Sequence, residues 1–464
     1  DAYSAFDVPT ATGLTFLNGG APFDPPSVTI KEFFGELRVP LLKDMPFAEE
    51  LSLEGAARYS DYGGNTGGVW AWNAGAIWSP VEGVRVRGSY ARSVRAPNLS
   101  NLFATPADTF SAAGWSDPCD QAGAPNNNTT NNITSNQNRA RNCAAAGIPT
   151  TLTYVDGSGN TVTVPWYNQG GSSLLGTTQG NPELESEVGK SWTVGAVFQP
   201  DFVPGLTVSI DYYNITVDNI IASLAGQNVI NQCYDDPGGI DNQYCAAIFR
   251  RAATGNPITD FAFAGQNARR LQNRTEDSFA RSGTSFLQQP FNFVSQKTSG
   301  IDLDVAYNTQ LTDDLRLNLR TLVSWVEKRE QFTSVTVPTQ STRILSTLGD
   351  PVWQGALTAT LDAKTWDFTY NARYVGKQML LGVTYETIRE WQGRQPTNPD
   401  IRPFDYYEPV VYHNIRLGLK ANKDTRFYMG VDNLTNELPP YDLTGTENPS
   451  ATGQSGAVYP NTGR

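Results

Sequence analysis

The sequence is poor in the residues that most enzymes and metal sites require: it has one histidine, three methionines and four cysteines among 464 residues. The lone histidine, His413, adjoins a predicted strand, where a hydrogen-bonded structural role is the usual one. With one histidine, and with cysteines that we expect to be paired, the common combinations of nucleophile and general base are unavailable. The sequence therefore predicts neither an enzyme nor a protein with a cofactor or a bound metal.

Long apolar runs and positive charge are also scarce. No stretch of the sequence reaches the roughly 18 apolar residues that indicate a transmembrane helix. A membrane β-barrel is not excluded, because strands that alternate have only mild average hydropathy. The 34 Lys and Arg residues are outnumbered by 46 Asp and Glu, which argues against nucleic acid as a partner. No signal peptide is visible from Asp1 onward, so we expect the sequence to start after any targeting segment.

The four cysteines form two local couples, Cys119 with Cys143 and Cys233 with Cys245, and both lie in polar stretches. Disulfides in an oxidising compartment explain this arrangement better than zinc, which needs four convergent ligands. Three aspartates follow Cys233 within 235–241. Calcium bound by their oxygens is an alternative there, but the run Asp-Pro-Gly-Gly indicates a turn first.

Aromatic residues and glycine, in contrast, are abundant, with 21 Phe, 20 Tyr, 10 Trp and 42 Gly. Apolar and polar residues alternate with a period of two about a dozen times, for example within 206–213, 301–307 and 415–420. This pattern predicts strands that have one apolar face and one charged face. The predicted strands lie at 27–42, 48–62, 68–79, 83–94, 188–199, 205–218, 296–310, 313–330, 351–362, 365–378, 408–421 and 424–433.

The connections between these strands differ at the two ends. Short turns recur at one end, whereas the connections at the other end are mostly long and polar, the largest being 96–188 and 219–292. Aromatic residues gather near strand ends, as at Trp70, Trp72 and Trp78. A soluble β-sandwich would also alternate, with its polar face in water. Short turns on one rim, long loops on the other and aromatic girdles favour an outer-membrane barrel instead.

One pair of carboxylates could have either a catalytic or a structural role. Asp302 and Asp304 share a strand face and could imitate a catalytic carboxylate pair. Arg316 and Arg320 on the next predicted strand offer them charge partners. We therefore interpret these residues as the lining of a barrel lumen.

Four motifs in the sequence contain Arg95, Ala96 and Pro97; Asn181 and Pro182; Gly300; and Asn433 with Leu434. Together they resemble motifs of the TonB-dependent outer-membrane receptors. Each motif is only moderately specific, but the four follow the family's order and hairpins fill the spacing between them. Ser186 stands where that family usually has proline after the second motif.

The resemblance implies an all-β transmembrane barrel, of which residues 1–464 would supply about twelve of 22 antiparallel strands. It implies a remnant of an extracellular loop at 1–26, long extracellular loops at 95–187 and 219–295, and a last one at 434–464. The N-terminal plug domain, with its TonB box, and the last strand would lie outside the sequence. The implied partners are the TonB complex, outer-membrane lipid and lipopolysaccharide, a small-molecule substrate and an accessory surface lipoprotein, in the outer membrane of a Gram-negative bacterium.

In such receptors the substrate binds where the extracellular loops meet the plug, so we looked for candidates in the long loops. Aromatic rings there could stack on a sugar or on a siderophore, although they could equally pack the loops together. Arginines, including Arg274, could attract an anionic ferric complex or form salt bridges on the loop surface. The candidate binding residues are Trp115, Trp166, Tyr167, Tyr234, Tyr244, Phe249, Arg269 and Arg270.

The sequence thus predicts active uptake of a nutrient, either a ferric siderophore or a saccharide or other organic compound. Two alternatives stay open. A passive outer-membrane porin would have no plug domain upstream of its barrel. A secreted glycan-binding protein or adhesin would stay soluble when membranes are washed without detergent.

Overall fold

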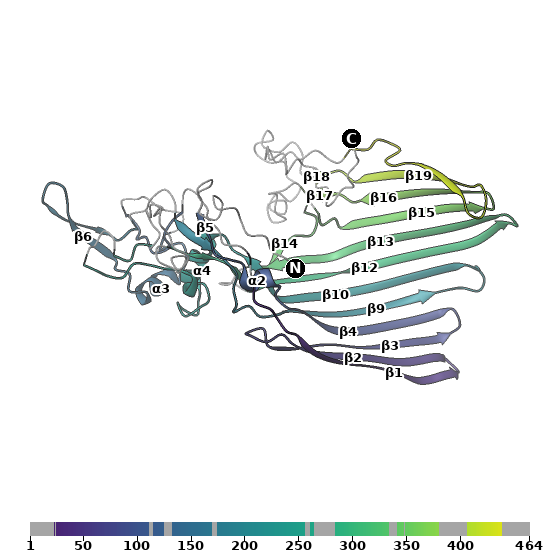
Figure 1. Cartoon of the computed structure of the whole chain (residues 1–464), viewed down its shortest axis with the longest axis horizontal. Helices are drawn as coiled ribbons and strands as arrows, with labels where there is room; N and C mark the ends of the chain where they lie inside the picture. Colours follow the sequence, from purple (N-terminus) through teal and green to yellow (C-terminus); the bar gives the residue numbers. More distant parts are fainter. Residues whose placement is uncertain are drawn as a thin grey trace, which may run out of the picture.

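The computed structural model describes residues 23, 25–110, 115–124, 132–168, 174–255, 260–263, 284–333, 341–347, 349–379 and 406–438. Most of these residues form one large, curved, open antiparallel sheet (Figure 1). Its strands follow in the order β1-β2-β3-β4-β9-β10-β12-β13-β15-β16-β19-β20, with β14 (Thr342–Arg343) beside β13. The twelve strands are β1 (Lys31–Met45), β2 (Ala48–Asp61), β3 (Gly68–Val81), β4 (Val84–Arg95), β9 (Glu187–Phe198), β10 (Leu206–Ser223), β12 (Pro290–Thr312), β13 (Leu315–Phe332), β15 (Trp353–Ala363), β16 (Trp366–Val375), β19 (Val410–Lys420) and β20 (Arg426–Val431).

All twelve predicted strands are confirmed, and so is the partial antiparallel barrel that they were expected to form. The largest differences concern β10 and β12, which extend about five residues further than predicted at the long-loop end. There Ile220–Ser223 pair with residues 290–294 beyond a register shift. A register shift interrupts strict alternation, so the period-two pattern stops before the strands do.

Paired residues on neighbouring strands point to the same side of a sheet, so the register fixes two faces. Ile210 pairs with Leu303, which pairs with Val323, and these rows make an apolar face. The next row, Asp211 with Asp302 and Ser324, belongs to a charged face.

The side chains of the apolar face are largely exposed among the described residues. Val194 and Leu419, for example, are each 51% exposed. Each square ångström of apolar surface left in water costs about 25 cal/mol, so this face suits contact with lipid.

The charged face is crossed by ion pairs between strands. Arg87 on β4 reaches Asp211 on β10 at 2.6 Å, and Arg320 on β13 reaches Asp304 on β12 at 2.9 Å. The second pair confirms that Asp304 has a charge partner on the next strand, as predicted, although Arg316 donates to Gln310 instead. Such exposed pairs stabilise little individually, but they show which face avoids lipid.

Short turns join the strands at one end of the sheet, and glycine is needed where these turns touch. Gly83 has φ +76°, and a Cβ there would lie 2.3 Å from the carbonyl oxygen of Gln199. Gly205 has φ +85°, and a Cβ there would lie 1.9 Å from the carbonyl oxygen of Asn308. Only glycine adopts this backbone and leaves room for the neighbouring turn.

At the other end, two long connections fold together beyond the sheet (Figure 1). We call the described residues of 96–186 and 224–289 the loop cluster. β8 pairs with β5 from its own connection and in parallel with β11 from the other, so one small sheet joins both. The elements of the cluster are α2 (Leu99–Phe103), β5 (Ala107–Phe110), α3 (Arg139–Ala145), β6 (Thr151–Val155), β7 (Thr161–Pro165), β8 (Leu175–Thr178), α4 (Gly226–Asp235), η1 (Cys245–Ala247) and β11 (Leu287–Gln288).

None of the helices in the described part of the chain has the length and apolar character needed to cross a membrane. A further short ladder, β17 (Gln378–Met379) with β18 (Tyr406–Tyr407), lies beyond β16 and β19.

The two-faced sheet leads to a first prediction. Leu303→Arg places a charge on the apolar face of β12 and should destabilise the protein in lipid vesicles by roughly 2–4 kcal/mol, the cost of Arg near the bilayer midplane. Ser324→Arg is the matched control, because it places the same side chain on the charged face, opposite Asp302. Urea unfolding of the full-length protein in vesicles measures both. Equal destabilisation by the two substitutions would contradict this assignment of faces.

Candidate functional site

Two disulfides lie inside the loop cluster. Cys119 is bonded to Cys143, and Cys233 to Cys245, which is the pairing predicted from the sequence. Each bond joins residues of the same connection, so the disulfides stabilise each connection separately. Contacts of another kind must therefore hold the two connections against each other.

The first such contact is a buried ion pair between Asp117 and Arg250. The guanidinium donates from both Nη atoms to the two carboxylate oxygens, at 2.7 Å each, and from Nε to the Tyr234 hydroxyl at 2.7 Å. It also lies over the Phe263 ring, 4.1 Å from the centroid. Asp117 is fully buried, and a bidentate pair with added hydrogen bonds is the geometry that offsets such burial.

The surroundings of the ion pair determine the protonation states of Arg250 and Tyr234. Burial lowers the pKa of Arg250, but the nearby Asp117 carboxylate and the Tyr234 hydroxyl outweigh it, so that the pKa is raised overall. Burial also raises the pKa of Tyr234. Arg250 therefore stays protonated and Tyr234 stays neutral, and the positive charge is held in place inside the cluster.

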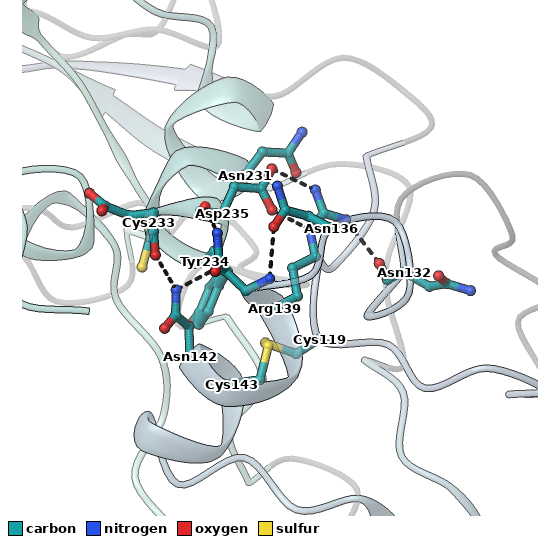
Figure 2. Close-up of polar contacts among 12 residues, drawn as sticks. Cys119, Asn132, Asn136, Arg139, Asn142, Cys143, Asn231, Cys233, Tyr234 and Asp235 are labelled. Atoms are coloured by element: carbon teal, nitrogen blue, oxygen red, sulfur yellow. Dashed lines mark hydrogen bonds and ion pairs between the residues drawn. A yellow bond between two sulfur atoms is a disulfide. The ribbon is translucent and has the colours of Figure 1, made fainter. Parts of the chain in front are cut away.

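The second contact joins α3 to α4 (Figure 2). Arg139 donates from Nε and Nη2 to the carboxylate of Asp235, at 2.5 and 3.0 Å, and from Nη1 to the carbonyl of Asn132 at 3.0 Å. Next to it, the Asn142 amide donates to the carbonyl oxygens of Tyr234 and Asp236. These bonds connect the helix of the first connection to the C-terminal end of the helix of the second.

The local sequence explains why α4 lies where these bonds can form. Its buried residues Val229, Ile230, Cys233 and Tyr234 recur at helical spacing and make one apolar stripe. That stripe packs into the core of the cluster and leaves Asp235, at the helix end, facing Arg139.

Two of the three aspartates within 235–241, Asp235 and Asp236, have other contacts. Asp235 pairs with Arg139, and Asp236 accepts from the Gly238 N–H in the predicted turn. Within the described ranges, no three His, Cys, Asp or Glu side chains form a group that could hold a metal ion.

The candidate binding residues divide by exposure. Trp166, Tyr234 and Tyr244 are only 2%, 3% and 1% exposed and belong to the core of the cluster. Trp115, Tyr167 and Phe249 are partly exposed at its edge, and Trp115 contacts the Phe263 ring edge-on. Arg269, Arg270 and Arg274 lie outside the described residues.

The motif residues gather where strands give way to the loops. Arg95 Nε donates to Glu187 at 2.7 Å, and Glu187 also accepts from the backbone N–H of Ile221, so three strands meet at one carboxylate. After Arg95 the chain continues through Ala96 and the buried Pro97 to α2. Asn181 is buried and donates to the carbonyl of Pro290, the first residue of β12. Pro182 follows Asn181 and is exposed.

Two further motif residues are explained by close approach and turn geometry. A Cβ on Gly300 would lie 2.3 Å from the carbonyl oxygen of Trp325, so no larger residue fits. Asn433 has φ +52°, a conformation that asparagine tolerates. Its side-chain amide donates to the backbone carbonyl of Glu437, and its side-chain oxygen accepts from the backbone N–H of Glu437. The N–H of Leu434 donates to the carbonyl of His413 at 2.7 Å.

The side chain of His413 is also engaged. Its Nδ1 lies 2.7 Å from the hydroxyl of Tyr370 on the neighbouring strand. This contact agrees with the structural role expected for the lone histidine.

The buried pair gives a second prediction. Asp117→Asn leaves the Arg250 charge uncompensated and should destabilise the loop cluster by about 3–5 kcal/mol, seen as faster hydrogen exchange of the α4 amides. The control Asp304→Asn disrupts an exposed pair and should cost less than about 1 kcal/mol. The double change Asp117→Leu with Arg250→Met should recover much of the protection. If Asp117→Asn exchanged like the unaltered protein, the pair would not hold the connections together.

The comparison with protein families agrees with this architecture. The sequence matches the family model described as TonB dependent receptor-like, beta-barrel, over residues 1–434. Among solved structures, it is similar to a mutant ferric enterobactin receptor of Pseudomonas aeruginosa, at 15% identity and a TM-score of 0.46, over 89% of this chain and 40% of that one. It is also similar to a siderophore receptor of Acinetobacter baumannii, at 11% identity and a TM-score of 0.47, over 89% and 43%.

The chain thus spans about 40% of the length of these two structures. The ferripyoverdine receptor of Pseudomonas aeruginosa is similar at 11% identity and a TM-score of 0.40, over 90% of this chain and 37% of that one. No curated protein matches the sequence. The match over residues 1–434 places the chain in the TonB-dependent receptor-like β-barrel family, whose members are outer-membrane proteins of Gram-negative bacteria.

Proposed function

We propose that the protein takes up a nutrient across the outer membrane, either a ferric siderophore or a saccharide or other organic compound, using energy delivered by TonB. The observation that supports this most is the family match over residues 1–434. A sheet with one apolar and one charged face agrees with it, because such a sheet separates lipid from a polar interior. The proposed partners are TonB, the substrate, outer-membrane lipid including lipopolysaccharide, and an accessory surface lipoprotein.

In this proposal the loop cluster is the extracellular part that meets the substrate. Its disulfides and buried ion pairs support a preorganised surface, and preorganisation reduces the entropy lost on binding. We assign contact with the substrate to Trp115, Tyr167 and Phe249, which are partly exposed. Trp166, Tyr234 and Tyr244 would act indirectly, by packing the cluster that holds them.

Arg269 and Arg270 are proposed to attract an anionic substrate. In the sequence they lie between residues 263 and 284, outside the described residues. A ferric siderophore that carries negative charge would use them, whereas a neutral saccharide would depend on the aromatic rings alone.

Uptake by the full-length protein tests the function. Cells that express it should take up the labelled substrate with saturation, and removal of TonB or collapse of the proton gradient should abolish that uptake. Candidate ferric siderophores and oligosaccharides are supplied in turn. Uptake that rises linearly with concentration and persists without TonB would instead support a passive porin.

The aromatic contacts give a separate prediction for the substrate identified in that way. Tyr167→Ala should weaken its binding about three- to tenfold, because an aromatic contact contributes roughly 0.5–1.5 kcal/mol beyond its buried area. Tyr428→Ala is the control, since Tyr428 is exposed on β20 and lies close to the short turn that joins β19 to β20, at the end of the sheet opposite the long loops. Isothermal titration of the purified full-length variants measures both. Equal affinities for the two variants would remove Tyr167 from the binding surface.

A further inference from the structure

Residues 180–187 run from the loop cluster into the start of β9, and they include the motif residues Asn181 and Pro182. We call them the crossing segment. Leu184 within the segment is only 1% exposed, so the segment is packed against its surroundings. Its hydrogen bonds to neighbouring parts of the chain show how the loop cluster is attached to the sheet.

The crossing segment closes the base of the first long connection. The N–H of Gly180 donates to the carbonyl of Ala104 at 2.9 Å, and the N–H of Asn181 donates to the carbonyl of Asn101 at 2.8 Å. A Cβ on Gly180 would lie 2.5 Å from the Ala104 nitrogen, so glycine is needed for this approach. Asn101 belongs to α2, which follows β4 at the loop end of the sheet (Figure 1). The two ends of this connection are therefore bonded to each other beside the sheet.

The second long connection leaves the sheet on paired strands, because β10 and β12 stay paired as far as Ser223 with Pro290. The crossing segment is bonded to this base as well. Asn181 Nδ2 donates to the carbonyl of Pro290 at 2.9 Å. The side-chain oxygen of Asn292 accepts from the N–H of Glu185 at 2.9 Å, and its amide donates to the carbonyl of Glu185 at 3.0 Å. The bases of both connections are thus joined at one place.

The crossing segment also contacts the connection between β2 and β3. Asn65 Nδ2 donates to the carbonyl of Glu183 at 2.9 Å, and Thr66 Oγ1 donates to the carbonyl of Leu184 at 3.4 Å. The segment therefore joins three connections to one another at the loop end of the sheet.

An irregular point in β10 lies beside this junction. The register shifts next to Asn219, whose φ is +58°. Hinges are often a few positions near the ends of elements that absorb a large backbone rotation, so Asn219 is a candidate hinge for the loop cluster. The amide of Asn292 donates to the carbonyl of Asn219 at 2.8 Å, in addition to its bonds with Glu185. One side chain thus holds both the candidate hinge and the crossing segment.

We propose that the loop cluster is a fixed platform, which does not swing or close when substrate binds, and that Asn292 is the positioning residue that fixes it. A single hydrogen bond contributes only modestly to stability. A swing of the cluster, however, would break the bonds to Glu185, to Asn219 and to the β2–β3 connection together. That combined loss favours one orientation of the cluster on the sheet.

A fixed platform would hold the partly exposed rings of the loop cluster at constant positions relative to the barrel. This consequence rests on the proposed function, in which those rings contact the substrate. The attachment itself does not depend on that function, because it can be measured in the protein without a substrate.

Double electron–electron resonance on the full-length protein in lipid nanodiscs tests the attachment. The spin labels are introduced as non-canonical amino acids, because the four native cysteines are paired. One label replaces Ala144, which is exposed on α3, and the other replaces Lys328 on β13. A second pair of labels, at Lys328 and at Val411 on β19, lies within the sheet and gives the width expected for a rigid body. The first pair should give a single distance distribution as narrow as that of the second.

Asn292→Ala removes the bonds to Glu185 and Asn219, and it should broaden the first distribution at least about twofold, because a released cluster populates several orientations. Asn292→Asp keeps an acceptor for the Glu185 N–H but lacks the amide donor, so it should broaden the distribution less. Asn160→Ala is the matched control, because Asn160 lies between β6 and β7 in the same cluster and its side chain is bonded within that turn. It should leave the width unchanged.

Two separate distances in the unaltered protein, or a width equal to that of Asn292→Ala, would contradict a fixed platform. A narrow distribution in Asn292→Ala would remove Asn292 from this role. Broadening of the pair within the sheet would show that the substitution disturbs the barrel as a whole, and it would equally overturn the assignment. Neither TonB nor a nutrient takes part in this measurement, so its outcome is separate from that of the uptake experiment.

Discussion

The structure depends on one constraint: in hydrocarbon, each backbone N–H and C=O must find its partner within the protein. An antiparallel ladder satisfies that requirement between neighbouring strands, and it then leaves the side chains to alternate between two surroundings. The apolar rows and the charged rows of this sheet are that alternation in three dimensions. The ion pairs of the charged face follow from it, because Arg87 and Asp211 can meet only on the side that excludes lipid.

Under the same constraint, the two ends of the sheet have different structures. Turns at one end are short and use glycine where neighbouring turns touch, as at Gly83 and Gly205. The other end is free of that requirement, and there the chain builds a cluster with its own core. Within the cluster, disulfides stabilise each connection, and the pairs Asp117–Arg250 and Asp235–Arg139 join the two connections. Because these pairs are buried, each charge requires its partner, and an unpaired charge at either position would strongly destabilise the cluster.

Much of this arrangement can be predicted from the sequence, because it rests on local patterns. Alternation identifies the strands, local couples of cysteines identify the disulfides, and the motifs identify the family. The loop cluster could not be predicted in the same way. Asp117 and Arg250 are 133 positions apart and belong to stretches without a regular pattern. For that reason the aromatic residues Trp166, Tyr234 and Tyr244 looked equally suited to binding and to packing, and only their burial separates them from Tyr167.

The central claim is that one face of the sheet contacts lipid and the other a polar interior. Single spin labels along β10, read by their collisions with oxygen and with a water-soluble nickel complex, test it most directly in the full-length protein in membranes. The account predicts that labels at positions 208, 210 and 212 meet oxygen preferentially, whereas labels at 207, 209 and 211 meet the nickel complex, with a period of two. A profile without that period, or with the two faces exchanged, would contradict the account.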